Sequence, residues 1–160
     1  EGETLAVGRY EYVLPRTLSS NTIAVIPVVR SSAGVWVGVE RRELPAAQEL
    51  AGSASLLACP AWRLPRSVTS PGEAQAFVSE RLPLDFGVRP LRHRELGGRY
   101  FPSPGITPEV VHPFVVEVDA SAPGSLEWVT LTALLARRRD LLDGHLIALA
   151  HRLSHALGAG

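Results

Sequence analysis

The histidines and the single cysteine are side chains whose types could support metal binding or catalysis. His151 and His155 are four residues apart near the C-terminus, a spacing that can hold zinc on a helix. No third ligand is evident, since His145 falls on another helical face, so we expect an exposed pair. Cys59 is either a nucleophile or a small buried hydrophobic side chain, and we favour the second interpretation. No G-x-S-x-G sequence for a nucleophilic serine is present.

The basic residues exclude several reaction classes. All 16 Lys and Arg positions are arginine, and 16 acidic residues balance them. Without lysine the chain has no P-loop, no Schiff-base or pyridoxal phosphate anchor and no protein-kinase site. The neutral balance also argues against a dedicated nucleic-acid-binding protein.

The length and composition predict one globular domain. The chain has 160 residues, of which 46% are hydrophobic. We expect a cytoplasmic protein, because no signal peptide is visible and no window of 18 apolar residues could span a membrane.

Hydrophobic patterning predicts strands, then a helix, then strands and two helices, which indicates an α+β or mixed α/β class. Thr22–Arg30 and Val35–Glu40 are expected to form a hairpin, and the last helix begins at Asp143 with a buried face. We leave Arg41–Ala61 undecided between a loop and a short helix. The predicted strands are 4–14, 22–30, 35–40, 62–65, 88–101 as a hairpin, 110–118 and 126–129, and the predicted helices are 73–82, from 130 or 132 to 136, and 143–157.

Two prolines are expected to limit these elements. Pro83 should stop or kink the helix that begins at Glu73, because proline removes a backbone donor and clashes with the preceding turn. Pro113 should place its strand at a sheet edge or at a bulge.

One constellation between Trp62 and Val88 has a chemical meaning. Its pieces are Trp62-Arg63-Leu64-Pro65, Pro71-Gly72-Glu73 and Asp85-Phe86-Gly87-Val88. Together they resemble the Nudix hydrolases, whose box reads G-x5-E-x7-R-E-U-x-E-E-x-G-U and usually follows W-x-L-P. The resemblance implies the Nudix fold, an α/β/α sandwich with a mixed sheet in the α+β class. It also implies Mg²⁺ or Mn²⁺ held by carboxylates, which hard cations prefer and which allow pyrophosphate hydrolysis.

The box is degenerate in this chain. Ser67 stands at the position of its first Gly, and the spacing from Glu73 to Gly87 is one residue too short. Only Asp85 falls on an acidic position whichever end of the box is aligned. The resemblance therefore implies catalytic roles for Glu73, Glu80 and Asp85, with Glu80 and Asp85 as metal ligands, in a site that is impaired or unusual.

A second motif follows the box. The stretch Ser103-Pro104-Gly105 with Glu109 is similar to the S-P-G-x-x-x-E motif of the ADP-ribose pyrophosphatase subgroup. The resemblance implies substrate contacts for Ser103, Pro104 and Gly105, and a water- or metal-positioning role for Glu109. A rigid turn between two strands is the alternative. Trp62 could stack on an adenine.

Two functions follow from the resemblance. The first is a Nudix-fold protein with an impaired box that binds a nucleotide-diphosphate-type ligand. The second is an active Mg²⁺-dependent hydrolase that cleaves the pyrophosphate of ADP-ribose or a related compound. In both cases we expect residues 1–18 to form an N-terminal β arm, residues 19–160 to form the domain, and two chains to form a homodimer, with no membrane or nucleic-acid partner.

Overall fold

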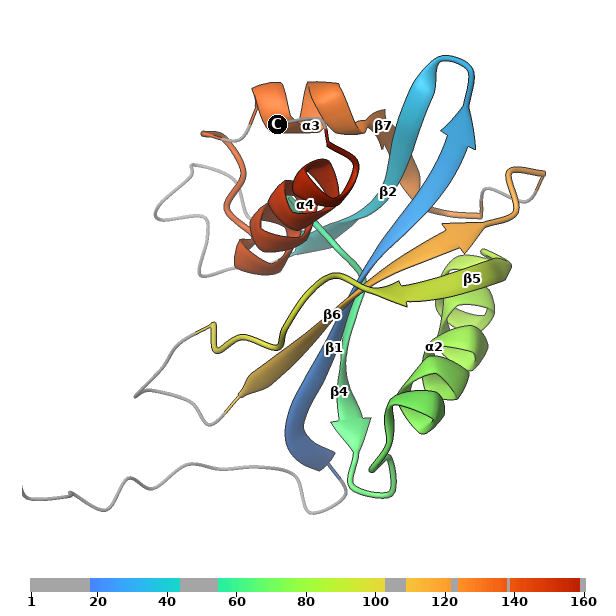
Figure 1. Cartoon of the computed structure of the whole chain (residues 1–160), viewed down its shortest axis with the longest axis vertical. Coiled ribbons are helices and arrows are strands. Elements are labelled where there is room, and N and C mark those ends of the chain that lie inside the picture. The colour runs from blue at the N-terminus through green and yellow to red at the C-terminus, as the bar shows by residue number, and fades with distance from the viewer. Residues whose placement is uncertain (1–17, 44–54, 103–108, 122–123, 138, 159–160) are drawn as a thin grey trace, which may run out of the picture.

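A mixed sheet with helices on both faces forms the centre of the protein (Figure 1). The computed structural model describes residues 18–43, 55–102, 109–121, 124–137 and 139–158. The strands are β1 (Leu18–Ser31), β2 (Gly34–Glu43), β3 (Ser55–Ala58), β4 (Ala61–Pro65), β5 (Pro90–Glu95), β6 (Val110–Val118) and β7 (Glu127–Thr130), and the helices are α2 (Pro71–Phe86), α3 (Leu131–Ala136) and α4 (Gly144–Ala156). The predicted α+β class with a mixed sheet is confirmed.

Strand β1 is the common neighbour of three other strands. Its N-terminal half lies between β4, which is antiparallel to it, and β6, which is parallel. Its C-terminal end forms the predicted hairpin with β2, where Val28 lies opposite Val37. Strand β2 then continues the sheet by pairing with β7 and β3. The two halves of the sheet are therefore joined through β1.

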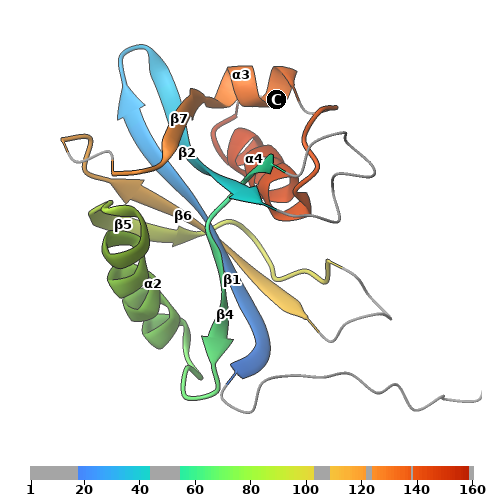
Figure 2. The ribbon, with the colours of Figure 1, turned by 180° about the vertical axis from the view of Figure 1, so that it is seen from behind.

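The alternation of β1 separates two hydrophobic cores. Ala24 and Ile26 belong to the core that includes the apolar side of α4, whereas Ile23 and Val25 belong to the core under α2. All four side chains are fully buried. Seen from behind, α2 lies beside β5 and α4 lies near β2 and α3 (Figure 2). Burial of each large aliphatic side chain contributes about 1.5–3 kcal/mol relative to exposure, so both helices are fixed by this strand.

Helix α2 is longer at both ends than predicted. Its N-terminus is Pro71 rather than Glu73, because Ser70 caps the helix. At the other end the helix passes through Pro83 and ends at Phe86, so the predicted stop at Leu82 is wrong. Pro83 is exposed and removes only one helical hydrogen bond. Burial of Leu82 and a left-handed Gly87 cap, whose N–H donates to the Pro83 carbonyl at 2.9 Å, outweigh that loss.

Neither the edge position nor the bulge predicted for Pro113 is found, since the irregularity in the β5–β6 pairing lies between Pro90 and Arg92. Strand β6 is an interior strand, with β1 on one side and β5 on the other. The carbonyl of Pro113 accepts from the N–H of Leu96 at 2.9 Å, so the side of Pro113 that lacks a donor faces the place where β5 ends. The sheet tolerates this proline because no further ladder bond is required there.

The remaining expectations have mixed outcomes. Thr130 and Asp143 cap α3 and α4 as predicted. The strand expected after Gly98 is reduced to a single bridge between Tyr100 and Val111. The 41–61 segment begins and ends as strands, while its residues 44–54, and almost all of the predicted arm 1–18, lie outside the described residues.

No helix in the described part of the chain is both long enough and apolar enough to cross a membrane.

Gly124 fixes the loop before β7 against the end of α2. It has a φ of 61°, and a Cβ there would lie 1.9 Å from the carbonyl oxygen of Phe86. The next residue, Ser125, donates its N–H to that same oxygen at 2.8 Å. The close approach of two backbones therefore requires glycine at this position.

We expect Gly124→Ala to cost about 3 kcal/mol or more of unfolding free energy, because it combines backbone strain with a steric clash. Gly158→Ala is the matched control: Gly158 has a φ of 69°, but a Cβ there meets nothing within 4 Å. This control should cost only about 1 kcal/mol. Urea unfolding measures both, and equal losses would show that the clash with Phe86 does not exist.

Candidate functional site

Two neighbouring residues of strand β4, Trp62 and Arg63, point to opposite faces of the sheet. Trp62 lies opposite Ile23 of β1, and Arg63 lies opposite Thr22. Since side chains at paired positions share a face, Trp62 belongs to the α2 face and Arg63 to the α4 face. The contacts of Trp62 with the aromatic rings of α2 agree with this assignment.

Asp85 has both carboxylate oxygens engaged. Oδ2 accepts a hydrogen bond from the Trp62 indole Nε1 at 2.8 Å, and Oδ1 accepts one from Nη2 of Arg81 at 2.7 Å. Edge-on contacts with Phe77 and Phe86, at 6.5 and 6.0 Å between ring centroids, fix the indole. The predicted metal ligand Asp85 and the predicted adenine-stacking residue Trp62 therefore hold each other.

Glu73 is engaged in starting helix α2. Its Oε2 accepts from the backbone N–H groups of Thr69 and Ser70 at 2.7 and 2.9 Å, while the Ser70 hydroxyl accepts from the Glu73 N–H. This reciprocal arrangement is a capping box. The hydrogen bond from the Thr69 backbone, followed by those from Ser70, lowers the pKa of Glu73 below its ordinary value of 4.5.

The three acidic residues predicted on this helix do not converge. Glu73 and Asp85 are 12 residues apart in one helix, about 18 Å along its axis. Glu80 is exposed and five positions before Asp85, which places the two about 140° apart around the helix. Nowhere among the described residues do three His, Cys, Asp or Glu side chains gather in a way that could hold a metal ion. The described residues thus do not fit a Mg²⁺ or Mn²⁺ site.

A cleft of about 330 Å³ adjoins the C-terminal end of α2, lined by Glu40, Arg41, Asp85, Phe86, Ser125 and Glu127. Each of its carboxylates is paired with an arginine. Besides the Arg81–Asp85 pair, Arg42 pairs with Glu40, and Arg41 with Glu127 at 3.0 Å. Burial raises the pKa of Glu40 despite its arginine partner. The arginine partners therefore offset the negative charge that would attract a divalent cation to this cleft.

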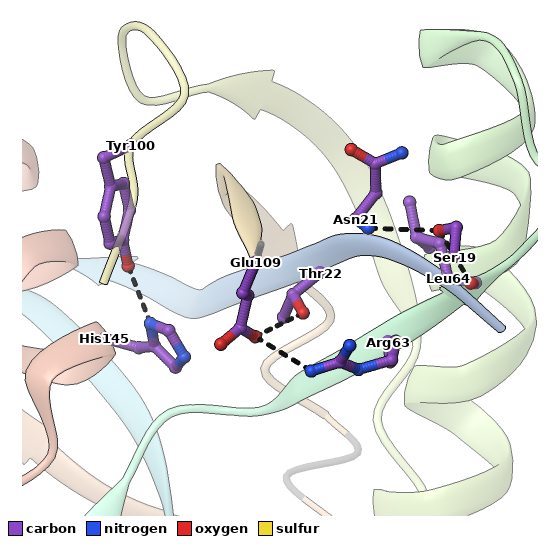
Figure 3. Close-up of polar contacts among 8 residues, drawn as sticks. All are labelled: Ser19, Asn21, Thr22, Arg63, Leu64, Tyr100, Glu109 and His145. Carbon is purple, nitrogen blue, oxygen red and sulfur yellow. Dashed lines mark hydrogen bonds and ion pairs between the residues drawn. The ribbon is translucent and has the colours of Figure 1, made fainter. Parts of the chain in front are cut away.

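The α4 face carries a second group of polar side chains, the Glu109 cluster, which consists of Thr22, Arg63, Tyr100, Glu109 and His145 (Figure 3). The Thr22 hydroxyl donates to Glu109 Oε1 at 2.5 Å, and Nη2 of Arg63 lies 3.9 Å from the same oxygen. Both charged side chains are partly exposed, at 29% for Arg63 and 19% for Glu109. The cluster therefore offers a cation and an anion on one surface.

Tyr100 and His145 form the other side of the cluster. The Tyr100 hydroxyl lies 2.9 Å from Nδ1 of His145, and the Arg152 guanidinium lies over the Tyr100 ring, 5.0 Å from its centroid. Burial raises the pKa of Tyr100 well above its usual value of 10. The hydroxyl therefore stays protonated at neutral pH and remains a hydrogen-bonding group.

The structure separates the predicted site residues. Asp85 makes its hydrogen bonds on the α2 face of the sheet, and Glu109 makes its hydrogen bond on the α4 face. Within the described part of the chain no hydrogen bond or ion pair joins these two residues. Ser103, Pro104 and Gly105 lie outside the described residues.

The predictions for Cys59 and for the histidine pair of α4 are confirmed. Cys59 is fully buried, as expected, and burial raises the pKa of its thiol. His151 and His155 are exposed on α4, as predicted.

Sequence reasoning missed four members of the Glu109 cluster. Thr22 and Tyr100 are predicted only as parts of strands, His145 is considered only as a third zinc ligand, and Arg63 only as part of the tetrapeptide with Trp62. For Arg63 the sequence does offer a signal. Successive side chains of a strand point to opposite faces, so Arg63 must lie on the face opposite that of Trp62. Thr22 and Tyr100 required knowledge of which strands pair, and His145 required knowledge of how α4 packs on the sheet.

Comparison with known proteins shows the fold but no family. No family model matches the chain, and no curated protein matches it. A crystal structure of Shewanella oneidensis NrtR matches with a TM-score of 0.61 and 13% sequence identity, over 87% of this chain and 64% of that one. The chain thus spans less than two thirds of the protein it matches. The likeness shows a Nudix-like fold, as predicted.

The assignment to the Nudix hydrolases and to their ADP-ribose pyrophosphatase subgroup is wrong, since neither family models nor curated sequences support it. The residues that suggested it have local structural roles. Pro71 and Glu73 lie in the first turn of a helix that Ser70 caps, and Gly87 ends that helix in the left-handed conformation. Helix caps favour these residue types in any fold, so they imitate part of a motif without its chemistry.

The capping role of Glu73 predicts a pH-dependent stability. We expect Glu73→Gln to lower the melting temperature at neutral pH, because the charged carboxylate is the better acceptor for the two backbone donors. The folded pKa is depressed, so this contribution is fully present above pH 4.5 and is lost as pH falls through the lower folded pKa. Thermal unfolding from pH 7 to pH 2.5, with exposed Glu80→Gln as control, tests this. A difference that grows on acidification would contradict the capping role.

Proposed function

We propose that this protein binds a small molecule of the nucleotide-diphosphate type and does not hydrolyse it. The observation that carries this proposal is the Glu109 cluster, in which Arg63 lies beside Glu109 and the Tyr100–His145 pair lies on the other side of Glu109 in Figure 3. Guanidinium groups bind phosphate oxygens through paired donors, and carboxylate, imidazole and phenol groups suit sugar hydroxyls. A ligand with both phosphate and sugar matches this set of groups.

The α2 face supports binding without hydrolysis. Metal-assisted cleavage of a pyrophosphate requires carboxylates that are free to hold the cation. Here Asp85 is held by Trp62 and Arg81, and Glu73 is held by the helix N-terminus. The Arg81 guanidinium paired with Asp85 would also repel a divalent cation.

The likeness to NrtR is compatible with this proposal. At 13% identity it supports a common architecture and nothing finer. The ligand class therefore rests on the chemistry of the Glu109 cluster.

We expect isothermal titration calorimetry in EDTA to show saturable binding of ADP-ribose or ADP, with Mg²⁺ adding little affinity. Adenosine, which lacks phosphate, should not bind. Incubation of ADP-ribose with the protein and Mg²⁺ or Mn²⁺ should release no AMP, because the described carboxylates do not fit a metal site.

Two results would overturn the proposal. The first is AMP release that Asp85→Ala abolishes and that Asp119→Ala, a control that removes a partly exposed aspartate from the loop after β6, leaves intact; this would establish a metal-dependent hydrolase. The second is the absence of binding to any of the nucleoside diphosphates, with the protein shown to be folded by circular dichroism.

A further inference from the structure

We propose that Glu109 is a built-in counter-ion of Arg63 that the ligand's phosphate displaces, which makes Arg63 the anion-binding residue and Glu109 a selectivity element. This inference rests on the proposed function and names the group that would recognise the ligand. It also gives Glu109 a role different from positioning water or metal.

The geometry of the pair shows why it can be displaced. At 3.9 Å, the separation between Arg63 Nη2 and Glu109 Oε1 is too long for a hydrogen bond. A guanidinium has five N–H donors in a planar fork, and the described residues give Arg63 no hydrogen bond from its side chain. Glu109 thus neutralises part of the charge on Arg63 without using its donors.

Thr22 holds Glu109 back from Arg63. Its hydroxyl donates to Oε1 at 2.5 Å, and Thr22 itself is only 4% exposed, so the hydrogen bond is protected. Oε1 is therefore engaged by a buried donor, and the described residues make no bond to Oε2. A carboxylate fixed in this way cannot move freely to close on the guanidinium.

The sheet sets the distance between the two charges. Arg63 lies on β4, and Glu109 immediately precedes β6, while Thr22 of β1 lies between these strands and pairs with Arg63 and Val111. Neighbouring strands are about 4.8 Å apart, so the two backbones are about 10 Å apart across β1. Both side chains therefore reach over Thr22 from fixed positions (Figure 3).

A diphosphate would make the stronger partner for Arg63. Phosphate oxygens can take two parallel N–H bonds from one guanidinium, whereas Glu109 takes none. The phosphate and Glu109 repel each other, and this repulsion weakens binding most for an anion that has no sugar hydroxyl. A ligand that places a sugar hydroxyl at Glu109 would recover this loss through a hydrogen bond.

The test uses inorganic pyrophosphate as the probe, in EDTA and at low salt, with calorimetry of single variants. We expect Arg63→Gln to weaken binding at least about 10-fold, as loss of a charge-assisted hydrogen bond does. Arg63→Lys should recover part of it. Glu109→Gln should bind pyrophosphate roughly 3- to 10-fold more tightly, since it removes one repulsive charge while keeping an acceptor for Thr22. Added salt should reduce this gain.

Matched controls remove the same charges elsewhere. Arg66→Gln removes an exposed arginine three residues further along, and Glu117→Gln removes a carboxylate from the other end of β6. Neither should change pyrophosphate binding more than twofold, so that a larger change in the Arg63 and Glu109 variants reports their position and not the net charge.

The inference is overturned if Arg63→Gln binds pyrophosphate like the parent, or if Glu109→Gln binds it no more tightly. When the parent binding is too weak to measure, Glu109→Gln must reveal binding that Arg63→Gln does not. If Arg63→Gln binds ADP-ribose as well as the parent does, this inference is wrong while the proposed function stands. Failure of all nucleoside diphosphates to bind the parent would instead overturn the proposed function.

Discussion

The pairing of strand β1 with three neighbours is the constraint on which the rest of the structure depends. Its N-terminal half is held between β4 and β6, and its end carries the hairpin to β2. Because alternate residues face opposite sides, one strand supplies the floor of both hydrophobic cores. A shift of one residue would exchange the two faces and expose Ile23 and Val25 to the wrong helix, so the register is strongly specified.

That register also separates the chemistry of strand β4. Trp62 turns to α2, where it completes an aromatic group and donates to Asp85. Arg63 turns to the opposite face, where it meets Glu109. Two adjacent residues thus contribute to one structural contact and one candidate ligand site. The degenerate motif contains Trp62 and Asp85, which form the structural contact, whereas the positive charge suited to an anionic ligand is that of Arg63.

Helix α2 illustrates how local stability can resemble a catalytic motif. Its capping box, its proline in the first turn and its terminal glycine are what an isolated helix needs at its ends. The two carboxylates already have hydrogen-bond donors: Glu73 accepts from backbone N–H groups, and Asp85 accepts from the side chains of Trp62 and Arg81. Nothing in residue types or spacing distinguishes such a carboxylate from one that is free to bind a metal.

The sequence by itself determined the local elements, because their causes are local. The β1–β2 hairpin follows from two apolar runs separated by the turn residues 31–34. The caps of α3 and α4 follow from Thr130 and Asp143, and the buried face of α4 follows from its helical spacing. The same local rules give wrong predictions for Pro83 and Pro113. Burial of Leu82 against the sheet and the end of β5 beside Pro113 decided those two positions.

Only the tertiary structure decided which side chains meet. Thr22 and Glu109 are 87 residues apart in the chain, and Tyr100 and His145 are 45 apart. Such pairs exist because β6 lies parallel to β1 and β4 antiparallel to it, a choice made by the packing of both cores and not by any local preference. Residue types fixed which groups could carry charge, and the strand order, which depends on contacts across the whole domain, fixed which charges would face each other.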